Sequence, residues 1–171
     1  MTGSEFPRVF DVRQVEGKAV RLEASEAERA ALAKRFGLVA VGRLEAEVLL
    51  SRDGLAVDAR GRIVADFVQS CAISAEDLPV SIDEPLAFRF VPETTGHAPD
   101  EEVELDAGDC DEIEYAGTHF DLGEAVAQSL ALAIDPFACG PEAEEARRRA
   151  GIIDETASGP FAALAALKKK D

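Results

Sequence analysis

The stretch GTHFDLGEAVAQSLALAIDPF, residues 117–137, predicts one helix whose two ends are both marked in the sequence. Asp121 can cap the first turn, Glu124 stands three residues later in the capping-box position, and Pro136 stops any continuation. Apolar residues recur on one side at helical spacing, at Leu122, Val126, Leu130 and Ala133. We therefore expect a helix over 121–134 that packs one face on a core.

A long hairpin is predicted in the first half of the chain. Residues 42–50, GRLEAEVLL, alternate between apolar and charged side chains, which is typical of a strand with one wet face. The Asp53-Gly54 pair is a strong hairpin turn, and the return strand LAVDARGRIVADFV covers residues 55–68. Gly61 inside that strand predicts a bulge or a bend.

Further strands are expected on both sides of this hairpin. The segment PVSIDEPLAFRFVP, residues 79–92, keeps its apolar residues at one parity, and Pro85 within it predicts an edge position or a bulge. Residues 7–15, PRVFDVRQV, predict an edge strand or an extended arm. Ile113 and Tyr115 predict a short strand that leads into the helix.

Two more helices follow from capping and composition. Ser25 and Glu28 form a capping box for a helix that ends at Gly37. A short helix is expected in PEAEEARRRAG, residues 141–151, and one or two terminal turns in residues 158–170.

These elements predict an α+β fold. We expect a mainly antiparallel sheet of about four to six strands with two or three helices packed on it. The predicted domain covers residues 1–150, and residues 151–171 form a C-terminal tail with a short helix.

The net charge of −16 is distributed unevenly along the chain. Acidic and basic residues balance up to Ser70, whereas residues 71–146 hold 20 acidic residues and one basic residue, Arg89. Ten of the acidic residues lie in 93–114, which predicts a solvated, mobile acidic loop near 93–110. Such a surface repels DNA and other nucleic acid and attracts a basic protein.

Cysteine usage and hydropathy predict the compartment. Cys71, Cys110 and Cys139 are isolated and have no CxxC spacing, which argues against a disulfide framework and favours a reducing compartment. No window approaches eighteen apolar residues and the N-terminus has no apolar signal region. We expect a cytoplasmic protein that does not enter a membrane.

Catalytic and metal-binding interpretations are weaker than structural ones. A zinc site would draw on Cys110, His119, Cys139, His97 and nearby carboxylates, but no pairing has the standard close spacing. His119 and Asp121 could form an acid–base pair, although a helix cap preceded by a turn histidine is favoured. We therefore expect no catalytic residue, no metal and no cofactor.

The densest basic clusters lie near the end of the chain. Arg147, Arg148 and Arg149 could contact RNA phosphates. They could equally pair with Glu142, Glu144 and Glu145 at helical spacing, and this structural interpretation is favoured.

Several separated stretches together resemble a known family. They are EAERAALAKRFGL, VQSCAI followed by EDLPVSIDEPLAFRFVP, DEIEYAGTHFDLGEAVAQSLALAIDPF, and GPFAALAALK. In this order, and over most of the chain, they resemble the YceD family in its alphaproteobacterial form. The most specific residues of the resemblance are Asp111, Tyr115, Gly117, Asp121, Leu122, Leu130 and Pro136.

The resemblance implies a role in ribosome biogenesis, because the family is named for a factor required for accumulation of the large-subunit ribosomal RNA. It transfers no catalytic residues. Some relatives carry paired cysteines suggestive of a metal site. Here Ser74 stands three residues after Cys71, and Cys139 has no later partner, which argues against a family zinc site.

We expect a non-enzymatic assembly factor that binds a basic large-subunit ribosomal protein or a pre-ribosomal RNA–protein surface. The predicted partner-binding residues are Asp111, Glu112, Glu114, Asp121 and Glu124, with Arg147 to Arg149 as a candidate RNA contact. Two alternatives stay open. One is a small metal- or thiol-dependent hydrolase that uses His119, Asp121 and a cysteine, and the other is a structural adaptor with an acidic loop.

Overall fold

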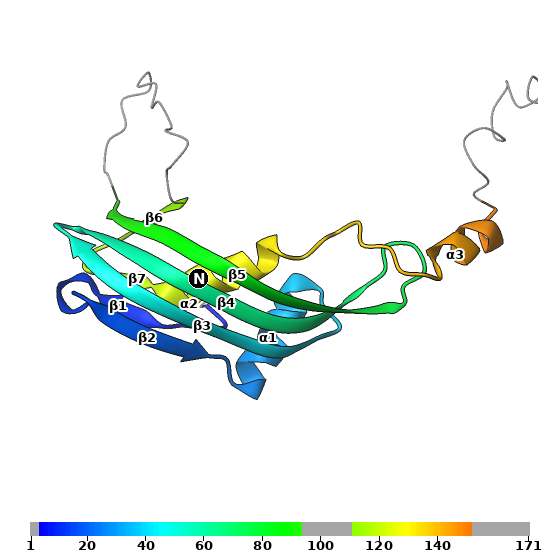
Figure 1. The fold of residues 1–171 in the computed structure, drawn as a ribbon, viewed down its shortest axis with the longest axis horizontal. Coiled ribbons are helices and arrows are strands. Elements are labelled where there is room, and N and C mark those ends of the chain that lie inside the picture. Colours follow the sequence, from blue (N-terminus) through cyan, green and yellow to red (C-terminus); the bar gives the residue numbers. More distant parts are fainter. Residues whose placement is uncertain (1–3, 94–110, 152–171) are drawn as a thin grey trace, which may run out of the picture. The chain divides into compact units, whose positions relative to one another are not determined.

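The computed structural model describes residues 4–93 and 111–151 (Figure 1). The predicted acidic loop, apart from Glu93, and the predicted terminal helix lie outside the described residues. The chain forms two compact units, which are Met1–Gln69 with Pro79–Ile134 and Ser70–Leu78 with Asp135–Asp171. The chain thus passes from one unit to the other at Ser70, at Pro79 and at Asp135. The domain boundary at residue 150 stays a prediction.

The three longest strands follow one another in the middle of the chain, and shorter strands precede and follow them. In chain order the described elements are β1 (Val9–Asp11), a 3-10 turn (Val12–Gln14), β2 (Lys18–Glu23), α1 (Glu26–Phe36), β3 (Ala40–Asp53), β4 (Ala56–Ser70), β5 (Asp77–Pro92), β6 (Asp111–Tyr115), β7 (His119–Asp121), α2 (Leu122–Leu132) and α3 (Ala143–Arg149). Within the ranges that the structure describes, no helix combines the length and apolar character needed to cross a membrane.

A five-stranded sheet in the order β2-β3-β4-β5-β6 dominates the first unit. Strands β2, β3 and β4 pair antiparallel, with Leu44 opposite Ala65 and Leu50 opposite Ala59. Strand β6 joins β5 in parallel and pairs Phe88 with Asp111. Helices α1 and α2 lie behind one face of the sheet in Figure 1. The predicted α+β class, with helices packed on a mainly antiparallel sheet, is confirmed.

The core lies between this face of the sheet and the helices. Its fully buried large side chains are Phe6, Phe67, Phe90, Leu32, Leu44, Leu50, Ile63, Leu122, Leu130, Val15, Val57 and Val126. Because side chains alternate between the faces of a strand, the same strands direct their charged residues to the opposite, outer face. The predicted parity of the long strands and of α2 therefore matches the observed core.

Gly61 lies where the backbones of β3 and β4 approach each other closely. The register between β3 and β4 runs without a shift through Val48 opposite Gly61, so no bulge occurs there. A Cβ atom on Gly61 would lie 1.9 Å from the carbonyl oxygen of Glu47 and 2.8 Å from the Cα of Val48. The irregularity of this ladder lies instead between Val41 and Arg43.

The edge position predicted from Pro85 is wrong for β5 as a whole, because β5 lies between β4 and β6. Around Pro85 itself, however, β5 has one unpaired side within the described part of the chain. Strand β6 pairs only with Phe88–Pro92, so among the described residues no strand lies on that side of Pro85. A proline without an amide hydrogen is tolerated where its strand has no neighbour to bond.

Pairing between distant segments produced two elements that the sequence analysis did not predict. Strand β2 pairs along β3 from Lys18 opposite Leu50 to Glu23 opposite Glu45. Strands β1 and β7 form a separate two-stranded sheet that places Phe10 opposite Phe120. The β1 segment is thus a paired strand, one of the two forms expected for residues 7–15.

Helix α1 begins with the predicted capping box. The Ser25 hydroxyl accepts from the backbone N–H of Glu28, and the Glu28 carboxylate accepts from the backbone N–H of Ser25. Gly37 ends the helix with φ of 65°. The Glu28 carboxylate also binds the Arg8 guanidinium through two hydrogen bonds of 2.7 and 3.1 Å. This bond to Arg8, with help from Ser25, lowers the pKa of Glu28 to about 2.

We predict that Gly61→Ala destabilises the first unit by about 3 kcal/mol or more, because both backbones would have to separate. Gly42→Ala is the matched control, since the nearest atom to its added Cβ lies at an ordinary 3.5 Å. Urea unfolding followed by circular dichroism measures both variants. Equal midpoints for the two variants would contradict this account of Gly61.

A second prediction concerns acid stability. The pKa of Glu28 is lower in the folded chain than its ordinary value of 4.5, so its contribution to stability is complete above that pH and is lost as pH falls toward 2. We expect Glu28→Gln to lower the free energy of unfolding at pH 7 and to reduce its loss between pH 5 and 3. Glu26→Gln, in the same helical turn, is the control. A parallel pH dependence for wild type and Glu28→Gln would refute the prediction.

Candidate functional site

A hollow of about 340 Å³ lies where β6, β7 and the first turns of α2 meet in the first unit. Its polar lining includes three of the five predicted partner-binding residues, Glu114, Asp121 and Glu124, together with His119 and Gln128. Its apolar lining consists of Phe90, Ile113, Tyr115, Phe120 and Ala125. We call this hollow the acidic pocket, because the described residues that line it include three carboxylates and neither lysine nor arginine.

Aromatic side chains form the floor of the acidic pocket. The rings of Phe90 and Phe120 lie 4.3 Å apart between centroids, and Tyr115 lies 6.5 Å from Phe120. All three side chains are buried. The Tyr115 hydroxyl donates a hydrogen bond of 2.6 Å to the carbonyl oxygen of Leu55, which fixes the ring at the sheet edge. Aromatic faces beside carboxylates favour a cationic ligand.

Asp121 has a structural role at the edge of this pocket. Its Oδ1 atom accepts backbone N–H groups from Arg8 at 2.8 Å, Gly123 at 3.0 Å and Glu124 at 3.2 Å. The predicted N-cap is therefore observed, and it also binds the N-terminal segment. A Cβ on Gly123 would lie 1.9 Å from the carbonyl oxygen of Phe6, so this close approach requires glycine.

Glu124 binds within the first unit instead of completing a capping box. Its carboxylate receives two hydrogen bonds from Arg35 of α1, at 2.7 and 2.9 Å, and one from Gln128 at 3.2 Å. The Arg35 guanidinium also binds Glu5 at 2.7 Å. Hydrogen bonds from Arg35 and Gln128 lower the pKa of Glu124 below its usual range. The charge of Glu124 is therefore largely offset by Arg35.

Strand β6 presents the least constrained carboxylates. Glu112 and Glu114 occupy alternate positions and so share one face of the strand, and both are exposed. Glu112 lies 4.0 Å from Arg89, which already binds Asp58 at 3.0 Å and Asp53 at 3.3 Å. One guanidinium thus serves three carboxylates. Asp111 begins β6, and its backbone pairs with Phe88.

His119 does not form the acid–base pair with Asp121. Its Nδ1 lies 3.0 Å from the Thr118 hydroxyl and its Nε2 lies 4.0 Å from Asp11. The imidazole is exposed, whereas the Oδ1 atom of Asp121 faces backbone donors. This arrangement gives the hydrolase alternative no geometric support. In residues 4–93 and 111–151, no group of three or more potential ligands is placed to hold a metal ion.

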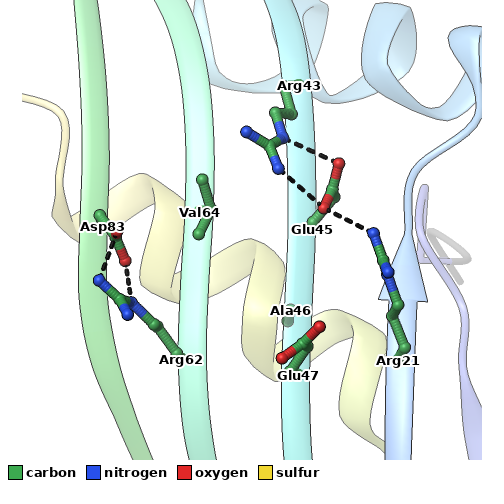
Figure 2. A pocket seen from close by; sticks show the side chains of 8 residues that line it. All are labelled: Arg21, Arg43, Glu45, Ala46, Glu47, Arg62, Val64 and Asp83. Atoms are coloured by element: carbon green, nitrogen blue, oxygen red, sulfur yellow. Dashed lines mark hydrogen bonds and ion pairs between the residues drawn. The ribbon is translucent and has the colours of Figure 1, made fainter.

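A second hollow, of about 250 Å³, lies on the outer face of the sheet (Figure 2). Arg21, Arg43 and Arg62 project into it from three strands. Arg43 and Arg21 both bind Glu45, and Arg62 binds Asp83. Each of these guanidinium groups thus has a carboxylate partner on the same face. Such a face has little excess positive charge to attract phosphate.

The arginine triplet lies in the second unit, on α3. Arg147 binds Glu144 at 3.0 Å and Arg149 binds Glu145 at 3.3 Å, the three- and four-residue spacings expected for a helix. Among the described residues, Arg148 has no carboxylate within 4.0 Å. The structural pairing favoured from the sequence is therefore observed for two of the three arginines, and RNA contact remains a prediction.

The chain was compared with family models, curated proteins and solved structures, and no match was found. The acidic pocket therefore has to be interpreted from its own geometry.

Sequence reasoning missed two groups that shape this pocket. Arg35 lies in the helix predicted to end at Gly37 but was not connected with this site, because its pairing with Glu124 depends on how α1 packs beside α2. Phe90 belongs to the strand predicted over residues 79–92, and Phe120 was not singled out. Their stacking requires β5 and β7, which no local pattern brings together.

We predict that Asp121→Ala lowers the free energy of unfolding by about 1–2 kcal/mol, the usual loss of a helix cap, because three N–H groups lose their acceptor. Asp121→Asn keeps an acceptor oxygen and should lose less. His119→Gln, at an exposed neighbouring position, is the control and should leave stability nearly unchanged. Urea unfolding measures all three, and wild-type stability in Asp121→Ala would rule out the capping role.

Proposed function

We propose that this chain is a non-enzymatic factor that binds a basic protein at the acidic pocket and at the adjacent face of β6. The observation that carries the proposal is the lining of the pocket, where Glu114, Asp121 and Glu124 accompany aromatic side chains and, among the described residues, no lysine or arginine. A lysine or arginine side chain of a partner is the chemistry that such a lining recognises best.

The contributions of the carboxylates differ. Glu112 and Glu114 are exposed and only weakly compensated, so they make the direct contacts to the partner. Asp121, whose Oδ1 accepts three backbone N–H groups, contributes a further carboxylate to the lining of the pocket. Glu124 is offset by Arg35 and positions the helix beside the pocket.

Charge along the sequence supports a basic protein over nucleic acid as the direct partner. Residues 71–146 hold 20 acidic residues and one basic residue. This range includes the whole of β6, β7 and α2. Bringing a phosphate backbone to this surface would oppose like charges, whereas a basic protein would lose the repulsion among its own cations.

The resemblance to the YceD family suggests which basic protein this is. We propose a large-subunit ribosomal protein, bound alone or on a pre-ribosomal particle in the cytoplasm. By covering the basic surface of that ribosomal protein until the protein meets ribosomal RNA, the chain would support accumulation of the large-subunit RNA. This identification rests on the resemblance, and the preference for a cationic partner rests on the pocket.

A charge variant of β6 tests the proposed binding surface, which consists of the pocket and the adjacent face of β6. Glu112→Gln/Glu114→Gln should weaken binding of a fluorescent arginine- and lysine-rich peptide by about 1 kcal/mol, roughly fivefold, as measured by fluorescence anisotropy at 50 mM salt. The matched control is Glu16→Gln/Glu23→Gln, which removes the same charge from exposed positions elsewhere in the first unit. Equal weakening in both variants would indicate a general charge effect and contradict the site.

The identity of the partner is tested separately by recovery of the tagged chain from lysate, with and without ribonuclease. Recovery of a large-subunit ribosomal protein after ribonuclease treatment supports the proposal. Recovery that depends on intact RNA would favour an RNA contact instead, with Arg148 as the first residue to substitute. Recovery of no ribosomal component at any salt concentration would overturn the ribosomal assignment. The peptide-binding assay would still decide separately whether the pocket prefers a cationic partner.

A further inference from the structure

The connection between β4 and β5 folds its backbone around the sulfur of Cys71. The Cys71 N–H donates to the carbonyl oxygen of Glu76 at 2.8 Å, and the Ala75 N–H donates to the carbonyl oxygen of Cys71 at 3.1 Å. Ala75 has φ of 61°, a left-handed conformation that costs a non-glycine residue roughly 1–2 kcal/mol. The turn directs the N–H groups of Ile73 and Ser74 at the sulfur, at 3.5 and 3.3 Å.

The segment after Asp135 contacts the same sulfur within the second unit. The Gly140 N–H donates to the Cys71 Sγ atom at 3.3 Å, and the Ala72 N–H donates to the carbonyl oxygen of Ala138 at 2.9 Å. Glu76 joins the two segments by accepting the Glu142 N–H at 2.9 Å. A Cβ on Gly140 would lie 2.3 Å from Glu76 Oε1, which shows how closely the segments pack.

These donors favour the thiolate form of Cys71. Hydrogen bonds from Ser74, first through its side chain, and from the Gly140 N–H lower the pKa of the Cys71 thiol to about 6. The side chain is nonetheless buried. A buried thiolate surrounded by N–H groups is protected from bulky reagents in solution and keeps its nucleophilic character toward a neighbouring sulfur.

A second cysteine, Cys139, lies in the segment that touches the Cys71 sulfur. Cys139 directly precedes Gly140, so its Cα lies two covalent bonds from the nitrogen that touches the Cys71 sulfur. Its thiol is exposed and donates to the carbonyl oxygen of Phe137 at 3.3 Å. The fold thus brings together two cysteines that are far apart in the sequence, one exposed to oxidants and one buried.

We propose that Cys71 and Cys139 form a reversible intramolecular disulfide when the protein meets hydrogen peroxide. The Cys139 thiolate attacks the peroxide, which gives a sulfenic acid on Cys139 and releases hydroxide. The Cys71 thiolate then attacks that sulfur and expels a second hydroxide. In the overall reaction two thiols and one hydrogen peroxide become one disulfide and two waters. A cellular dithiol reductant returns both thiols.

The disulfide would lock the β4–β5 connection to the segment that follows α2. In the reduced state, hydrogen bonds and close packing around Gly140 join these two parts of the second unit. A disulfide of this kind does not conflict with a reducing compartment, because it forms transiently in response to an oxidant.

Mass spectrometry of the full chain tests the proposal. Trypsin leaves Cys110 and Cys139 in the same peptide, because no lysine or arginine lies between Arg89 and Arg147, so the assay uses the Cys110→Ser background. After peroxide treatment and alkylation of free thiols, we expect the peptide containing Cys71 to be linked to the peptide containing Cys139. Cys71→Ser should abolish the link and leave a sulfenic acid on Cys139 that dimedone traps.

A second variant separates a chemical role of the turn from mere proximity. Ser74→Ala removes the hydroxyl that does most to favour the thiolate, and it should slow disulfide formation at pH 7 by up to about tenfold while dimedone-trapped Cys139 accumulates. Ser70→Ala is the control, and circular dichroism verifies folding. Linkage of Cys139 only between two chains, or its over-oxidation with Cys71 left free in wild type, would overturn the proposal.

Discussion

The Asp121 carboxylate joins three parts of the first unit through one oxygen atom. Oδ1 caps α2 through Gly123 and Glu124 and holds the N-terminal segment through Arg8. The Leu122 N–H donates in return to the carbonyl oxygen of Arg8 at 3.0 Å. Arg8 then reaches Glu28 and so connects the start of α2 to the capping box of α1. The positions of both helices on the sheet depend on this set of bonds.

The acidic pocket is a consequence of the same arrangement. Capping at Asp121 sets where α2 begins, and the β1–β7 pairing places Phe120 against Phe90. The parallel addition of β6 to β5 then brings Glu114 to the rim. Carboxylates that stabilise the fold thereby stand beside carboxylates that have little internal compensation. A partner with cationic side chains would supply the missing compensation.

Two regions of the sheet differ in how their charges are satisfied. In the hollow on the outer face, Arg21, Arg43 and Arg62 each have a carboxylate partner, so that region is nearly balanced. At the sheet edge, Arg89 alone serves three carboxylates, and β6 adds another in Glu114. Among the described residues, Glu112 and Glu114 of β6 are thus exposed carboxylates with little cationic compensation.

Local signals in the sequence determined the helices, their caps, the long hairpin and the parity of the core strands, because capping and alternation depend on neighbouring residues. The Ser25 capping box and the Asp121 cap are examples. Only the tertiary structure decided that Arg35 binds Glu124, that β6 runs parallel to β5, and that Cys139 lies beside Cys71. Those contacts join segments that are far apart in the chain, and no local periodicity encodes which distant segments pack together.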